Sequence, residues 1–363
     1  MRLDPRVKEA LERAAGAVHQ AEQSMQLLHT LPSARLPSAW NRAAGALRPA
    51  AQFAALAAVC AAVHSIGLLG RLLGSLAVGA GIAVYGWRRS SLSASGAVAA
   101  ALVGWGTLGA SFRSGLLLLT FFFASSKLTQ FGEELKDVDE EHKKGGQRDW
   151  RQVMCNALVP TGLALAAAWL AGGAPADLAL GEAPAAAAAR PALTQLLTAL
   201  HAAFLGYYAC CCGDTWSSEL GQLSPEEPRL ITTLRPVRKG TNGGVTLLGL
   251  GAALAGGLAM GATFWLATLL SPCGGGLAGA GARQWGMVAL GVGAGLAGSL
   301  IDSLLGATIQ FTGYNRVTGK VTGRPGPDVS HISGLAVLDN NAVNAVSASL
   351  TAALAAGAAA LAF

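Results

Sequence analysis

Residues 284–308, QWGMVALGVGAGLAGSLIDSLLGAT, decide the fold class of this protein. Asp302 is the only charged residue in the run. A helix needs about 20 mostly apolar residues to cross a bilayer, so the run predicts a membrane-spanning helix. An ionisable side chain inside such a helix is costly, which makes Asp302 a candidate functional residue.

The composition of the whole chain extends this prediction to most of its length. Of 363 residues, 52% are hydrophobic and 13% are charged, whereas soluble domains carry about 25% charged residues. Too few charges remain to cover a water-facing surface. The net charge of +6 does not indicate a nucleic-acid partner, because the basic residues are spread along the chain and form no patch with aromatic residues.

Further apolar runs are similar to residues 284–308 in length and character. The sequence therefore predicts an all-α fold, a polytopic membrane helix bundle of about nine spans in the lipid bilayer. The other spans are expected at 49–70, 72–87, 90–112, 114–126, 152–176, 191–213 and 245–270, and after Asp339.

The distribution of basic residues predicts the topology. With the N-terminus on the inner (cytosolic or stromal) side, all but four of the 26 Lys and Arg residues fall on that side, as the positive-inside rule requires. The four exceptions are Arg71, Arg113, Arg190 and Arg283. This topology places the long polar segments 127–151, 213–242 and 311–331 on one face, where they can build one site.

Two regions flank or interrupt the expected integral membrane domain, residues 51–363. Residues 1–50 read as an N-terminal helix and linker, and apolar residues from Val7 to Leu28 alternate at spacings of four and three, a heptad pattern. Residues 1–30 then form a helix that lies on the membrane or protein, or one that binds a partner helix. Residues 173–194 are rich in Ala and Pro and predict a low-complexity outer loop without site chemistry.

Two acidic motifs predict a metal site. Residues 213–219, GDTWSSE, place Asp214 and Glu219 among hydroxyl groups, a set of oxygen ligands that suits Mg²⁺. The alternative is that Asp214 caps a new helix. In the second motif, residues 298–310, Ser299 and Asp302 share one helical face with Ser303, Gly306 and Gln310.

Three further motifs predict contacts with a phosphate or polar ligand. Residues 240–246, GTNGGVT, place paired glycines before a helix, which exposes N–H groups and the positive end of the helix dipole to an anion. An ordinary turn is the alternative. Arg148 follows a diglycine and can clamp a phosphate. The remaining candidates are Lys239, Thr241, Asn242, Gly243 and Gly244 in and before the glycine-rich turn, and Asp339, Asn340, Asn341 and Asn344 at the start of the last span.

These motifs together resemble the transmembrane protein 19 family, an integral membrane family catalogued as a domain of unknown function. The matching strings are GGQRDWRQVMCNALVPTGLAL, GDTWSSELG, LITT with KGTNGGVT, GSLIDSLLGATIQFTG and LDNNAVN, in family order across about residues 90–350. The family includes the plant chloroplast kinase that converts phytyl phosphate to phytyl diphosphate. The glycine-rich turn and the GDT start also look like the core of CTP-dependent membrane lipid kinases such as dolichol kinase.

The resemblance implies phosphoryl transfer from CTP or another NTP to an isoprenyl monophosphate, with Mg²⁺. It implies Asp214, Asp302 and Arg148 as catalytic residues, and Asp214, Glu219, Asp302 and Asp339 as metal ligands. Phosphate and nucleotide contacts would come from the turn residues and from Ser299, Asn340, Asn341 and Asn344. The segment GGQRDW follows the animal-type members of the family, whose reaction is not established, rather than the plastid kinase. The expected location is the chloroplast envelope or the endoplasmic reticulum.

Two other functions are compatible with the residues alone. A transporter or flippase of an anionic lipid or metabolite would use the same aspartate, glycines and amides without turnover. A non-catalytic membrane scaffold acting through the N-terminal helix would need none of them.

Overall fold

The computed structural model describes residues 38–65, 67–136, 138–140, 146–173, 177, 180–181, 190–271 and 284–363, with the backbone alone for 38–50. The chain divides into two compact units, one up to Ser75 and one from Leu76 to Phe363. The heptad pattern of residues 1–30 lies outside the described residues. The first unit contains α2 (Ser38–Ser65) and the start of α3 (Leu68–Arg88), so α2 begins well before the first expected span.

The second unit contains the end of α3 and seven further helices of the described chain. They are α4 (Ala94–Ala110), α5 (Phe112–Gln130), α6 (Trp150–Leu170), α7 (Pro191–Gly221), α8 (Leu247–Leu270), α9 (Gly286–Thr308) and α10 (Asn340–Ala362), with the short 3₁₀ helix η1 (Glu133–Leu135). Each predicted span thus has a helix, and the all-α polytopic bundle is confirmed. Six of the described helices, α3 and α6 to α10, are long and apolar enough to cross a membrane.

Helix α7 occupies the centre of the second unit. The most apolar window of α7 is 83% buried, against 22–44% for the other five candidate spans. Its neighbours α8 and α9 meet along a seam of glycines spaced four residues apart, Gly257 and Gly261 against Gly291 and Gly295. A Cβ atom on Gly257 would lie 2.3 Å from the carbonyl oxygen of Gly291, so only glycine permits this approach.

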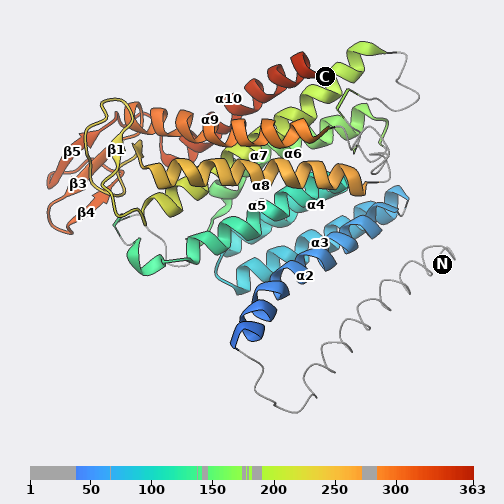
Figure 1. Cartoon of the computed structure of the whole chain (residues 1–363), viewed down its shortest axis with the longest axis horizontal. Helices are drawn as coiled ribbons and strands as arrows, with labels where there is room; N and C mark the ends of the chain where they lie inside the picture. Colours follow the sequence, from blue (N-terminus) through green and yellow to red (C-terminus); the bar gives the residue numbers. More distant parts are fainter. Residues whose placement is uncertain are drawn as a thin grey trace. The chain divides into compact units, whose positions relative to one another are not determined.

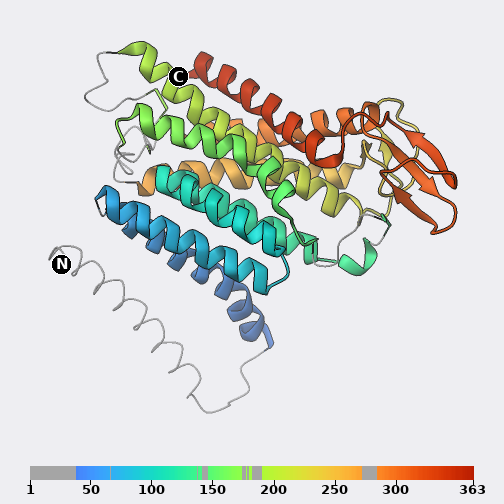
Figure 2. The ribbon, with the colours of Figure 1, turned by 180° about the vertical axis from the view of Figure 1, so that it is seen from behind.

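The polar segments between the helices gather at one end of the second unit, as the sequence predicts. Helices α5, α7 and α9 end there, and α6, α8 and α10 begin there (Figures 1 and 2). Hydrogen bonds join the segments: Ser93 N–H donates to the Arg148 carbonyl, and Glu140 N–H donates to the Val321 carbonyl. Which side of the membrane this face occupies stays a prediction.

Two small sheets at this end were not expected from the sequence. Strands β1 (Arg229–Leu230) and β2 (Gly244–Val245) pair antiparallel, while β3 (Thr312–Asn315) lies between β4 (Lys320–Thr322) and β5 (Val329–Ser333), both antiparallel to it. Residues 311–331, read as a loop, therefore form most of a three-stranded sheet. Its strands are too short to give a clear alternating pattern.

The far end of the unit holds a polar contact that the Ala/Pro-rich segment 173–194 was not expected to make. Asp177 is buried and accepts hydrogen bonds from the Ser111 hydroxyl (2.6 Å) and the Arg113 N–H (3.0 Å). These groups lie at the N-terminus of α5, so Asp177 helps to cap that helix. The segment thus contributes a structural contact, although most of it lies outside the described residues.

Candidate functional site

A cavity of about 230 Å³ lies where α7, α8 and α9 meet the polar segments. It contains nine of the residues singled out from the sequence. These are Asp214, Lys239, Thr241, Asn242, Gly243, Gly244, Ser299, Asp302 and Asn340. The structure therefore brings together residues from four motifs that are up to 126 positions apart in the chain, from Asp214 to Asn340.

Three carboxylates line this cavity, and two of them, Asp214 and Asp302, come from helices packed side by side; the third is Asp139. Asp214 lies inside α7, which continues to Gly221, so the alternative that Asp214 caps a new helix is wrong. Just before Asp214, Gly213 lets α7 pack directly on α9: a Cβ atom there would lie 2.6 Å from the Gly295 carbonyl oxygen. Asp302 lies on α9 and lines the same cavity as Asp214. The pair therefore favours a cation between the two helices.

A hydroxyl group supports the Asp302 carboxylate, and a pair of hydroxyls lies beside Asp214 and Asp302 on α7 and α9. Ser347 of α10 is fully buried and donates to Asp302 Oδ2 at 2.8 Å. Ser217 of α7, one turn after Asp214, lies 2.8 Å from the Ser299 hydroxyl. Ser347 follows Asn340 and Asn344 at spacings of four and three, so helical periodicity could have placed it on the same face.

The glycine-rich turn packs its backbone on α9. Gly243 has a φ of +77°, and a Cβ atom on it would lie 2.5 Å from the Ser303 carbonyl oxygen. The Gly244 N–H donates to the Thr241 carbonyl at 3.0 Å, within the turn. The expected phosphate cradle therefore cannot use the Gly244 N–H as folded. Gly244 stabilises the turn through its N–H, and Gly243 permits the close contact with α9.

The polar side chains in and before the turn differ in their hydrogen bonding. The Lys239 ammonium donates to the carbonyls of Gln222 (3.1 Å) and Ser224 (2.6 Å), which fixes the turn to the end of α7. The Asn242 amide donates to the Thr312 hydroxyl at 2.9 Å. The Thr241 hydroxyl is buried in the cavity wall, and no described residue of the chain forms a hydrogen bond with it. A ligand with a polar group would satisfy it.

The donor set of this cavity fits Mg²⁺. In the described part of the chain no group of three or more His, Cys, Asp or Glu side chains gathers as a metal site. Mg²⁺, however, is commonly bound through one or two carboxylates, with waters and substrate phosphates as the other ligands. Asp214 and Asp302 supply two carboxylates, and the α8 N-terminus, capped by Thr246, faces the same cavity.

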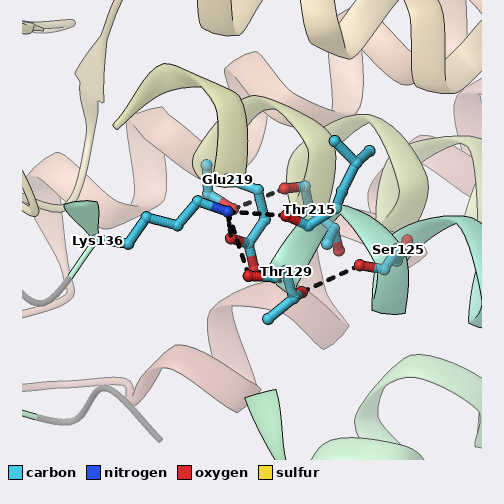
Figure 3. Close-up of polar contacts among 7 residues, drawn as sticks. Ser125, Thr129, Lys136, Thr215 and Glu219 are labelled. Atoms are coloured by element: carbon cyan, nitrogen blue, oxygen red, sulfur yellow. Dashed lines mark hydrogen bonds and ion pairs between the residues drawn. The ribbon is translucent and has the colours of Figure 1, made fainter. Parts of the chain in front are cut away.

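A second, larger cavity of about 880 Å³ adjoins the first and contains Glu219. Both Glu219 oxygens are engaged: Oε1 accepts from the Thr129 hydroxyl and Oε2 from the Lys136 ammonium, each at 2.7 Å (Figure 3). Lys136 is 2% exposed and also donates to the carbonyls of Leu128 and Thr129. These contacts hold Glu219 to the end of α5 and do not bring it to the Asp214–Asp302 pair.

The start of α10 distributes its polar residues between the two cavities. Asp339 caps α10 by accepting from the Ala342 N–H at 2.8 Å and lines the larger cavity with Asn341. Asn340 lines both cavities. Asn344 lines neither, and its carbonyl accepts from the Ser347 hydroxyl. Asp339 is therefore placed as a helix cap, apart from the two carboxylates.

Arg148 lies outside both of these cavities. Its guanidinium donates to the Ser126 hydroxyl at 2.9 Å and borders an apolar cavity of about 80 Å³ between α3, α4, α5 and α6. Removal from water lowers the pKa of Arg148, and the charge of Glu219 opposes that effect. Its backbone pairs with Leu92, which joins the α3–α4 turn to the segment before α6. The structure thus does not place Arg148 beside the two carboxylates.

Comparison with known proteins assigns the chain to a family. The family model described as integral membrane protein DUF92 matches residues 77–352, nearly the whole second unit. The chain belongs to this family. Membership confirms the resemblance noted from the motifs, and it confirms an integral, multi-pass membrane protein.

Relatives of this DUF92 chain come from a plant, an archaeon and a cyanobacterium. The chain is 48% identical to Protein PGR of Arabidopsis thaliana over 283 residues, which cover 77% of this chain and 93% of the relative. It is 29% identical to uncharacterized membrane proteins of Methanocaldococcus jannaschii and of a Synechocystis strain. These matches cover 56% and 57% of this chain, and 67% and 66% of the relatives. No solved structure matches the chain.

Proposed function

We propose that this protein transfers the terminal phosphoryl group of a nucleoside triphosphate, CTP or another NTP, to an isoprenyl monophosphate. The observation that carries the proposal is the cavity shared by Asp214, Asp302, the 240–246 turn and the α8 N-terminus. Phosphoryl transfer needs positioned cationic and N–H groups more than covalent participation by the protein. The family resemblance supplies the substrate class.

The proposal gives separate roles to the carboxylates, the hydroxyl groups and the helix N-terminus. Asp214 and Asp302 hold Mg²⁺, which when bound would neutralise phosphate charge. The Thr241 hydroxyl and the α8 N-terminus bind the acceptor phosphate, and Ser347 orients Asp302. An oxygen of the isoprenyl monophosphate attacks the γ-phosphorus, the bond to the β,γ-bridging oxygen breaks, and a nucleoside diphosphate leaves with the isoprenyl diphosphate.

The test is a turnover assay with purified protein in detergent and Mg²⁺. Labelled CTP and ATP are each combined with phytyl, geranylgeranyl and farnesyl monophosphate. We expect a diphosphate product that EDTA abolishes. Asp214→Asn and Asp302→Asn should each lower turnover by about 10²-fold or more, the scale seen when one preorganised electrostatic group is removed. Asp328→Asn, an exposed aspartate outside both cavities, is the matched control.

Turnover at the wild-type level in both carboxylate variants would remove these residues from the mechanism. No product with any pair, from folded protein that still binds an isoprenyl phosphate, would refute the kinase proposal. The transport function would then be tested next, by uptake of the same phosphate into vesicles.

A further inference from the structure

We propose that the larger, second cavity is the nucleotide site of this protein. The base and ribose lie among its amide side chains, and the triphosphate crosses the wall that it shares with the Asp214–Asp302 cavity. This inference rests on the proposed phosphoryl transfer and adds where each of the two substrates binds.

The sizes of the cavities separate the substrates. Cavities that bind small organic ligands measure about 300–1,000 Å³. The second cavity, at about 880 Å³, lies in this range, while the first, at about 230 Å³, does not. The first cavity therefore has room for phosphate groups and a metal ion, and a nucleoside needs the second.

The lining of the second cavity excludes a hydrocarbon tail. Leu338 is the one aliphatic hydrophobic residue among its described lining residues. Amide side chains dominate instead, and amides form paired hydrogen bonds with the donor and acceptor edges of nucleobases. The amides are Gln147, Gln152, Gln222, Gln310, Asn340 and Asn341.

Four carboxylates also line this cavity, and each has a partner within the protein. Glu219 pairs with Lys136, and Glu140 accepts from the Asn315 amide at 2.8 Å. Asp149 and Asp339 cap α6 and α10. These contacts orient the carboxylates without removing their charge, and three cations, Lys136, Arg151 and Arg324, line the same cavity.

The shared wall provides the path between the cavities. Ser218, Gln222, Gln310 and Asn340 line both. Gln222 Oε1 is buried and has no hydrogen-bond partner among the residues that the structure describes. A buried acceptor without a donor is costly, and a hydroxyl or amino group of a ligand spanning the wall would satisfy it.

The experiment measures binding without turnover. Isothermal titration calorimetry follows Mg²⁺–CTP, Mg²⁺–ATP and, separately, farnesyl monophosphate binding to the full-length protein in detergent. Gln152→Ala and Asn341→Ala should each weaken nucleotide binding about fivefold, the loss expected for one hydrogen bond. Farnesyl monophosphate binding should stay unchanged. Thr241→Val, in the first cavity, should weaken farnesyl monophosphate binding and leave nucleotide binding unchanged.

Gln130→Ala is the matched control, because Gln130 is exposed at the end of α5 and lines neither cavity. Nucleotide binding by the wild type that neither second-cavity variant weakens would overturn the site assignment and leave the proposed function standing. Farnesyl monophosphate binding without binding of either nucleotide would overturn the proposed function, and the nucleotide site with it. Unfolding temperatures equal to the wild type show that each variant is folded.

Discussion

Replacing Ser347 with alanine tests whether Asp302 acts as a metal ligand. The Ser347 hydroxyl is fully buried and donates to Asp302 Oδ2 at 2.8 Å. A hydrogen bond to a charged group contributes about 1.5–3 kcal/mol, which corresponds to a factor of roughly 10 to 150. Removing a hydrogen-bonding partner of a metal ligand typically lowers metal affinity about 10- to 100-fold. Both routes give the same range.

The assay is turnover as a function of Mg²⁺ concentration, with Mn²⁺ binding as an independent measurement. We expect Ser347→Ala to raise the half-saturating Mg²⁺ concentration about 10- to 100-fold, because Asp302 loses the group that orients it. Turnover at saturating Mg²⁺ should fall much less. A merely structural role of Ser347 would lower turnover or the unfolding temperature without moving the metal dependence.

Ser349→Ala is the matched control on the same helix. Its hydroxyl donates to the Ala345 carbonyl at 2.7 Å, within α10, and it lines neither cavity. The reasoning is refuted if Ser347→Ala and Ser349→Ala show the same Mg²⁺ half-saturation and Mn²⁺ affinity as the wild type.

Three further predictions concern the turn, the buried ion pair and the sheet. Gly243→Ala should lower stability by at least about 1–2 kcal/mol, the cost of a side chain at positive φ, and lower turnover as the turn leaves α9; thermal unfolding and the kinase assay check this. Lys136→Met should lower the free energy of unfolding by about 3–5 kcal/mol, because Glu219 loses its buried partner. Combining Lys136→Met with Glu219→Gln should recover most of this loss in unfolding experiments, and no recovery would contradict the pairing. Hydrogen bonds to the Glu140 carboxylate, the one from the Thr318 hydroxyl first, lower the pKa of Glu140. The contact therefore stabilises the sheet above the ordinary glutamate pKa, and this stabilisation is lost as the pH falls through the lowered pKa. Hydrogen exchange of residues 315–322 should rise only at that lower pH, and Glu140→Gln should remove the transition.

The sequence predicted the bundle and the gathering of its polar segments for a simple physical reason. Charge-free runs long enough to cross a bilayer can be recognised without knowledge of their neighbours. An even number of spans between polar segments then returns the chain to the same face. Asp302 could be singled out for the same reason, because a charge inside an apolar run is conspicuous by itself.

The positions of individual side chains could not be predicted where tertiary contacts determine them. Glu219 follows Asp214 by five residues, and on a helix that spacing turns it to another face, toward Lys136. The close contact between Gly213 and Gly295 of α9 joins residues far apart in the chain, which no local pattern reveals. The role of Ser347 cannot be predicted from α10 alone, because it depends on the hydrogen bond to Asp302 of α9.

The glycine seam between α8 and α9 has a consequence for the two carboxylates. Gly295 belongs to that seam and also receives Gly213, the residue before Asp214, backbone against backbone. Main-chain contacts therefore fix the two helix backbones that carry Asp214 and Asp302 against each other. A single methyl group added at Gly295, away from both carboxylates in the sequence, should therefore shift the two aspartates relative to each other and lower the turnover proposed above.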